Sequence, residues 1–168
     1  MWKVEQLSGV TAGQTTYLDR MHPTTRATYR YVRYQSFASA IYGQLWKMFY
    51  PQGAKQIPVE LPDLLSQPLA LAVWYMDDGY YFPRERECYL YLGTVSTEEA
   101  ETAQAAVATN FGLAPRVLDK RRKGYALYFS SRQARALADV IGTDLLPYFR
   151  YKLPFDPVTT DRLLIKQS

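Results

Sequence analysis

Residues 69–79 read Leu-Ala-Leu-Ala-Val-Trp-Tyr-Met-Asp-Asp-Gly, an apolar run that ends in two adjacent carboxylates and a glycine. Pro68, just before it, suits the first turn of a helix, where a missing N–H costs no hydrogen bond. Gly79 is a natural place for such a helix to stop. The stretch therefore predicts a helix over residues 68–78 that is apolar on nearly every side and is buried against more than one neighbour.

The place of the two acids in this helix is unusual. Asp77 and Asp78 fall at its C-terminus, where the helix dipole disfavours anions. Acids at that position need a nearby cation, and carboxylates beside free backbone carbonyls are the hard oxygen ligands that divalent ions prefer. The residues alone leave two interpretations open: a metal site, or a core helix whose Asp-Asp-Gly begins a turn.

Residues 71–79 resemble the LAGLIDADG motif of homing endonucleases, in the form found in the second repeat of the two-repeat yeast mitochondrial type. Val73 stands where the motif has its first glycine. In that family the last aspartate of the motif binds the catalytic metal. The resemblance therefore implies that Asp78 is a direct metal ligand and a catalytic residue, and that Asp77 assists in metal binding through its carbonyl. The residues that match motif letters are Leu71, Ala72, Asp78 and Gly79.

Two further segments resemble the same family. Residues 55–58, Lys-Gln-Ile-Pro, and residues 151–154, Tyr-Lys-Leu-Pro, are similar to the segments that end the first and second repeats. The resemblance implies that Lys55 and Lys152 are catalytic residues, which stabilise the pentacovalent phosphate or polarise the attacking water. Each lysine taken alone would be better explained as a solvent-exposed cation; the two segments on both sides of one motif favour the catalytic interpretation. The implied cofactor is a divalent cation, Mg²⁺ or an alternative such as Mn²⁺.

The order of predicted elements agrees with this resemblance. From Pro68 onward the periodicities give helix, hairpin, helix, hairpin, helix, with Ser96 and Ser131 as caps of the later helices. The resemblance then implies an α+β LAGLIDADG homing-endonuclease fold, αββαββα, with a saddle-shaped antiparallel sheet in residues 59–168. Residues 1–58 are expected to be an N-terminal hairpin-plus-helix extension that looks like part of a first repeat.

Local patterns give more detail around the motif. Residues 28–34 alternate like a strand, with residues 2–7 as a candidate partner, and residues 37–49 form an amphipathic helix that we interpret as core. Alternation in residues 87–92 places Cys88, Leu90 and Leu92 inward and turns Glu87, Tyr89 and Tyr91 outward. The water-orienting role that the family has near the end of this strand falls to Thr94 or Ser96.

The distribution of charge favours a nucleic-acid partner. The chain combines 20 Lys and Arg residues with 15 tyrosines and has a net charge of +4. Residues 116–125 hold five cations and one acid and read as a hairpin with a basic tip, whereas the predicted helix after Ser96 exposes acids. Such segregation favours an anionic partner over a merely solvated face. The candidate nucleic-acid contacts are Arg30, Arg33, Arg84, Arg86, Tyr89, Tyr91, Arg116, Lys120, Arg121, Arg122, Lys123 and Tyr125.

Composition indicates the compartment. At 168 residues, 48% of them hydrophobic, the chain can bury one sizeable core. Its single cysteine, Cys88, excludes an internal disulfide framework and is typical of a reducing compartment. No run approaches the roughly 20 apolar residues of a membrane span, and residues 1–5 lack a signal-like core. We expect an intracellular protein with no membrane partner, in the cytoplasm, at the nucleoid or in an organellar matrix.

The leading hypothesis is an intron- or intein-encoded homing endonuclease that cuts double-stranded DNA at a specific site. One Asp78 supplies one acidic site, so cutting both strands calls for a homodimer that pairs the 69–79 helices, with Ala70 and Ala72 permitting close approach. A separate first-repeat partner is the alternative assembly. The alternative function is an RNA-binding intron maturase, or a nuclease-dead relative, that holds structured RNA. A third possibility is an ordinary structural α+β domain.

Overall fold

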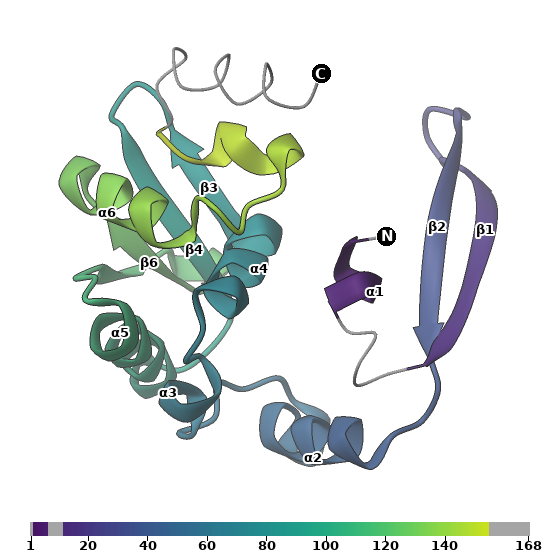
Figure 1. Ribbon diagram of the computed structural model, residues 1–168, viewed down its shortest axis with the longest axis horizontal. Coiled ribbons are helices and arrows are strands. Elements are labelled where there is room, and N and C mark those ends of the chain that lie inside the picture. Colours follow the sequence, from purple (N-terminus) through teal and green to yellow (C-terminus); the bar gives the residue numbers. More distant parts are fainter. Residues whose placement is uncertain (1, 7–11, 155–168) are drawn as a thin grey trace. The chain divides into compact units, whose positions relative to one another are not determined.

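The computed structural model describes residues 2–6 and 12–154 (Figure 1). Backbone contacts divide the chain into two compact units, Met1–Met48 and Phe49–Ser168. The boundary predicted from the sequence falls after residue 58. Within the second unit, the backbone N–H of Ile57 donates a hydrogen bond of 2.7 Å to the carboxylate of Glu99. That residues 1–58 derive from a first repeat stays a prediction.

The first unit holds a two-stranded antiparallel hairpin, β1 (Gly13–Met21) and β2 (Thr28–Ser36). The prediction that residues 2–7 pair with the 28–34 strand is wrong. Trp2–Gln6 form the short helix α1, Leu7 lies outside the described residues, and β1 is the partner of β2. An alternation over so few residues does not separate a strand from one turn of helix, whereas β1 is rich in residues that favour strands.

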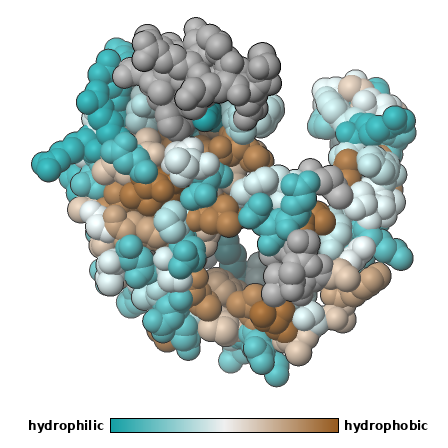
Figure 2. All heavy atoms as spheres, in the orientation of Figure 1, coloured by the Kyte–Doolittle hydropathy of each residue, from teal (hydrophilic) through white to brown (hydrophobic). Residues whose placement is uncertain are grey.

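The amphipathic segment after this hairpin forms the helix α2 (Ala40–Phe49), shorter than predicted. Its interpretation as core is wrong, since none of its residues is buried and the side chain of Trp46 is 58% exposed. Hydrophobic atoms gather over this helix in the surface view (Figure 2). A two-stranded hairpin offers no second layer that could cover an apolar helix face.

The second unit is built on a four-stranded antiparallel sheet in the order β3-β4-β6-β5. Its strands are β3 (Gly79–Phe82), β4 (Glu87–Gly93), β5 (Arg116–Asp119) and β6 (Tyr125–Phe129). The inward side chains predicted for β4 are buried, and Leu127 and Phe129 of β6 join them. The predicted αββαββα order is confirmed in this unit.

Helices of the second unit cover the inward face of this sheet (Figure 1). The inward residues of α5 and α6, among them Val107, Leu137 and Ile141, are fully buried. No helix among the described residues has both the length and the apolarity that crossing a membrane requires. The helical segments are η1 (Pro51–Gly53), α3 (Leu61–Leu64), α4 (Pro68–Asp78), α5 (Thr97–Phe111), η2 (Arg121–Lys123), α6 (Ser131–Ile141) and η3 (Pro147–Lys152).

Capping explains where the helices begin. The hydroxyl of Ser96 accepts a hydrogen bond from the Glu99 N–H, and the Glu99 carboxylate accepts one from the Ser96 N–H, which is the predicted capping box of α5. For α6 the predicted cap is displaced by one residue. Ser130 holds the N-cap position and Ser131 is the first helical residue. The Ser130 side chain makes no capping hydrogen bond, so α6 depends on its buried face.

Candidate active site and nucleic-acid interface

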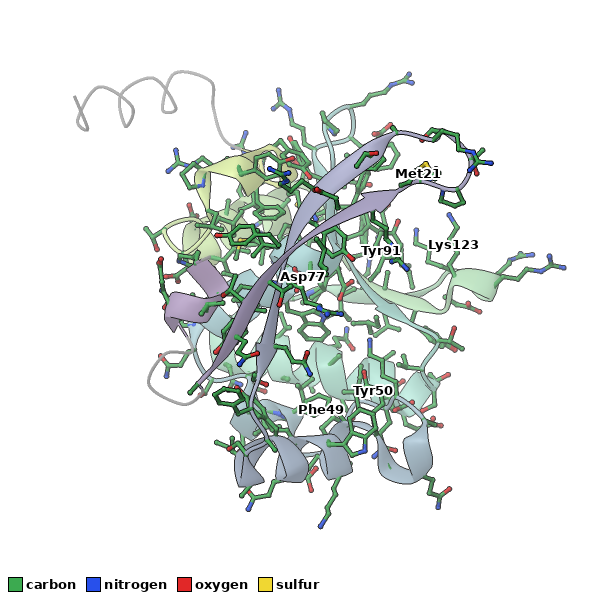
Figure 3. The ribbon with its side chains drawn as sticks, turned by 90° about the vertical axis from the view of Figure 1, so that its right-hand side faces the viewer. Met21, Phe49, Tyr50, Asp77, Tyr91 and Lys123 are labelled. Carbon is green, nitrogen blue, oxygen red and sulfur yellow. The ribbon has the colours of Figure 1, made fainter. Side chains whose placement is uncertain are left out.

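The motif helix α4 runs directly into strand β3 without a loop. Gly79 is both the C-cap of α4 and the first residue of β3, and its N–H donates to the Tyr75 carbonyl. A Cβ at position 79 would lie 2.3 Å from that carbonyl oxygen, so a glycine is required at this junction. The junction fixes Asp77 and Asp78, both exposed, at the point where the sheet begins. Figure 3 labels Asp77.

Lys152 reaches the end of α4 from the last helical turn, η3. Its ammonium group donates a hydrogen bond of 2.8 Å to the backbone carbonyl of Met76. In return, the hydroxyl of Tyr75 donates a hydrogen bond of 2.8 Å to the backbone carbonyl of Lys152. These two bonds run in opposite directions and join neighbouring residues of α4 to one residue of η3. They hold the predicted catalytic lysine beside the predicted metal ligands.

Buried side chains pack directly behind the site. Tyr75 and Cys88 are fully buried, and the Cys88 thiol lies 4.0 Å from the Lys152 carbonyl oxygen. Burial raises the pKa of Cys88 to about 11 and raises the pKa of Tyr75 above its usual range. Both groups therefore keep their protons near neutral pH, and the Tyr75 hydroxyl stays a hydrogen-bond donor.

The electrostatic environment of Lys152 combines two opposing effects. Partial burial lowers the pKa of the ammonium group, and the negative charges of Asp77 and Asp78 act in the opposite direction. The two carboxylates are thus close enough to stabilise the charged form of the lysine. One cation and two anions meet at the C-terminal end of α4, where the helix dipole itself favours a cation.

The donors at this end of α4 fit a divalent cation that is shared with a substrate. Among residues 2–6 and 12–154, no three His, Cys, Asp or Glu side chains gather into a complete metal cage. Mg²⁺ in phosphate-handling sites commonly binds one or two carboxylates, and water and substrate phosphate supply the other ligands. The carboxylate of Asp78 and the backbone carbonyl of Asp77 are oxygen donors of the type that such a site needs from the protein.

The other predicted catalytic groups lie in different surroundings. Lys55 is exposed and lines a pocket of about 290 Å³ whose wall includes Trp74 and Leu92. Of the two candidates for orienting water, Thr94 is exposed, whereas the hydroxyl of Ser96 is engaged in capping α5. Lys152 is the lysine that contacts the backbone of α4.

The outward face of the sheet carries a row of aromatic rings. Tyr80, Tyr89, Tyr128 and Arg116 are successive cross-strand partners on the four strands. The rings of Tyr89 and Tyr128 lie 5.4 Å apart. The Arg116 guanidinium lies 4.8 Å from the centre of the Tyr128 ring, and the Lys120 ammonium lies 4.2 Å from the centre of the Tyr89 ring. These are cation–π contacts, which place two positive charges over the sheet.

A carboxylate to which the sequence pattern assigns no role lies beside this row. Glu87 accepts a hydrogen bond from the Tyr128 hydroxyl and another, of 3.4 Å, from the Tyr89 hydroxyl. The alternation in β4 turns Glu87 outward but indicates no function for it, and Tyr128 is not among the predicted contacts. The alternation of residues in β6 could have predicted that Tyr128 lies on the outward face of the sheet. The cross-strand pairing with Glu87 needed the register of the sheet.

The predicted basic tips are exposed at two turns. Arg84 and Arg86 lie in the β3–β4 turn. Arg121, Arg122 and Lys123 form η2 at the tip of the β5–β6 hairpin, where Figure 3 labels Lys123. The turn closes tightly through Gly124, which has a φ of +75°, a conformation that favours glycine.

Three other candidates have different surroundings. Tyr125 is half-buried, and its hydroxyl is hydrogen-bonded at 2.8 Å to that of Thr97 at the start of α5. In the first unit, Arg30 forms an exposed ion pair with Asp19 across the hairpin, with a shortest distance of 2.9 Å. Arg33 is exposed on β2.

Comparison with known proteins shows the family. Residues 1–137 match the LAGLIDADG DNA endonuclease family. An uncharacterised protein of Methanocaldococcus jannaschii is 28% identical over 115 residues, which are 67% of this chain and 44% of that protein. A probable intron-encoded DNA endonuclease 3 of Mycosarcoma maydis is 25% identical over 125 residues, 72% of this chain and 91% of that protein. The chain thus spans less than half of the archaeal relative and most of the fungal one.

The fold agrees with the family. The structure of the homing endonuclease I-WcaI bound to its DNA recognition sequence is similar to this chain with a TM-score of 0.75 and 20% identity. The similarity covers 91% of this chain and 69% of that one. The chain belongs to the LAGLIDADG DNA endonuclease family. The predicted α+β LAGLIDADG fold is confirmed.

Proposed function

We propose that this chain is a homing endonuclease that hydrolyses double-stranded DNA at a specific site with the help of a divalent cation. The observation that carries the proposal is the meeting of Asp77, Asp78 and Lys152 at the point where α4 passes into the sheet. An origin in an intron or intein is part of the proposal, supported by the name of the fungal relative.

The chemistry assigns a role to each of these residues. The carboxylate of Asp78, assisted by the backbone carbonyl of Asp77, would hold the ion, Mg²⁺ or Mn²⁺. When bound, the ion makes a water nucleophilic and stabilises the oxygen that leaves the phosphate. The ammonium group of Lys152, held by the Met76 carbonyl, would stabilise the additional negative charge on the phosphate in the transition state. Asn in place of Asp78 would lack the negative charge that holds the ion, and Met in place of Lys152 would lack the positive charge.

The outward face of the sheet supplies the proposed DNA contacts. Arg116 and Lys120 lie over tyrosine rings, and the exposed cations of the two hairpin turns extend along the same sheet. Each phosphate that such cations neutralise releases counterions and makes binding more sensitive to salt. Side chains from the sheet would read base edges in the major groove, which is wide enough for a β-ribbon.

The proposed assembly is a homodimer through α4. Leu69, Ala70, Val73 and Trp74 form a half-buried apolar side of α4 that leads toward Asp77. Pairing two such helices about a two-fold axis would bring two acidic sites together. Ala72 cannot contribute, since it is fully buried inside the second unit. A separate protein that carries a first motif is the alternative partner for the same side of α4.

The test is cleavage of a randomised double-stranded DNA library by the full chain, with Mg²⁺ and with EDTA. Metal-dependent cuts at one enriched, roughly two-fold symmetric site are the expected result, and sedimentation of the protein–DNA complex would report the number of chains. Absence of cutting together with tight binding to structured intron RNA would contradict the nuclease and support the maturase function.

A further inference from the structure

Glu87 occupies a position that is unexpected on a surface proposed to bind DNA. It is half-buried on the outward face of β4, two residues before Tyr89 and among the side chains assigned to DNA contact. A carboxylate there repels phosphate, so it weakens binding unless it has another role. Its hydrogen bonds indicate that role.

Both oxygens of the Glu87 carboxylate are engaged by tyrosines of the same face. Oε1 accepts a hydrogen bond from the Tyr128 hydroxyl on β6, and Oε2 accepts one from the Tyr89 hydroxyl on its own strand. The hydrogen bond to Glu87 is the main reason why the pKa of Tyr128 is raised, so this hydroxyl stays a donor. Because its oxygens are used in this way, Glu87 is poorly placed to accept a hydrogen bond from a cytosine amino group.

The two tyrosines are the same ones that carry the cations. Arg116 lies over the ring of Tyr128, its cross-strand partner, and Lys120 lies over the ring of Tyr89. A ring whose hydroxyl is fixed by a charge-assisted hydrogen bond cannot turn freely. The carboxylate therefore restrains two rings, and each ring restrains one cation.

We propose that Glu87 is a positioning residue for DNA recognition, which fixes Tyr89 and Tyr128 and thereby sets where Lys120 and Arg116 meet the DNA. The inference rests on the proposed function, because it assumes that this face binds DNA. Pre-ordering of long basic side chains reduces the entropy lost when they bind, and it favours the one target whose groups match their positions. Glu87 thus lowers the affinity for DNA in general and raises the selectivity for one target sequence.

The experiment depends on the sign of the effect. Glu87→Gln removes the negative charge and leaves one oxygen to accept from two hydroxyls. If Glu87 were a bystander, losing its repulsion would tighten binding to every duplex. If Glu87 positions the cations, the target does not gain in this way. The ratio of the affinity for the selected target to the affinity for a scrambled duplex falls roughly fivefold or more, because the cations lose their order.

The matched control is Glu101→Gln, which alters an exposed carboxylate on α5 outside the tyrosine row. It makes the same change of charge without touching either tyrosine, so the affinity ratio should stay within about twofold of wild type. Affinities would be measured by fluorescence anisotropy in EDTA on the full chain, with circular dichroism to check the fold of each variant.

Tyr128→Phe tests the same link independently, since it keeps the ring under Arg116 and removes the hydroxyl that Glu87 holds. Its affinity ratio should fall as well, and the double variant should lose no more than Glu87→Gln alone, which already releases both rings. An unchanged or improved ratio in both Glu87→Gln and Tyr128→Phe would overturn the inference while leaving the nuclease intact. A wild-type chain that prefers no duplex would overturn the proposed function itself and this inference with it.

Discussion

The ammonium group of Lys152 and the backbone carbonyl of Met76, 76 residues apart in the chain, are joined by a hydrogen bond of 2.8 Å. Met76 is the residue immediately before Asp77, so this bond places the cation next to the carboxylates of Asp77 and Asp78. The lysine is thereby kept at the C-terminal end of α4.

Replacing Lys152 with Met should impair catalysis more than binding. We expect the single-turnover cleavage rate to fall about 10²-fold to 10³-fold, the usual effect of removing one donor to transition-state charge. Affinity for the target in EDTA should stay within about tenfold. Lys47→Met, at an exposed position of α2, makes the same change of charge elsewhere and should leave the rate unchanged. Equal rate losses in both variants would remove Lys152 from the mechanism.

Replacing Tyr75 with Phe should destabilise the fold. The variant keeps the ring in the core but leaves the Lys152 carbonyl with only the weak Cys88 thiol donor at 4.0 Å, and such a loss typically costs about 1–3 kcal/mol. Urea denaturation of the full chain measures the change. Tyr80→Phe removes a hydroxyl from a half-exposed ring and should cost less than about 0.5 kcal/mol. If the two variants are equally stable, the hydroxyl of Tyr75 does not hold η3 to α4.

The basic tip of the β5–β6 hairpin should determine part of the salt dependence of binding. Substituting Arg121 and Arg122 together with Ala should weaken binding and reduce the slope of log K against log salt by up to about 1.8, or about 0.9 for each phosphate that the protein no longer neutralises. Arg132 and Arg135, exposed on α6, provide a control pair of equal charge. A slope unchanged from wild type would place the hairpin tip off the DNA.

The buried thiol of Cys88 predicts a loss of stability at high pH. Its pKa is about 11 in the folded chain against an ordinary value of 9.0, so the unfolded chain loses this proton first as the pH rises. The stabilising contribution is therefore complete below about pH 9 and is lost progressively as the pH approaches 11. The free energy of unfolding of wild type should fall by roughly 2 kcal/mol more over this range than that of Cys88→Ala. Parallel curves for the two proteins would contradict the burial of the thiol.

Local patterns in the sequence predicted most of the second unit. The apolar run before Asp77, the alternation in β4 and the capping box at Ser96 each depend on residues close in the chain, and each is found in the structure. The prediction for the N-terminal segment was wrong because it also depended only on residues close in the chain. Residues 2–6 carry too short a pattern to decide between a helix and a strand, and the real partner strand, β1, has few apolar residues.

The contacts of the candidate site were less predictable because they join distant segments. The family resemblance indicated Lys152, but its bond to Met76 and the return bond from Tyr75 depend on how η3 packs on α4. The pairing of Glu87 with Tyr128 likewise depends on strand order, since β4 lies next to β6. The hydrogen bond between the hydroxyls of Tyr125 and Thr97 also joins separate elements, and the role of Tyr125 as a DNA contact stays a prediction.

The central claim is that the acids at the end of α4 catalyse DNA cleavage with a metal ion. The most direct measurement compares wild type, Asp78→Asn and the control Asp139→Asn, which alters an exposed acid of α6, on the selected target in Mg²⁺. The account predicts that Asp78→Asn abolishes cleavage while target affinity in EDTA stays within about tenfold, roughly 1.4 kcal/mol, and that Asp139→Asn cuts at the wild-type rate. Cleavage by Asp78→Asn at the wild-type rate would contradict it.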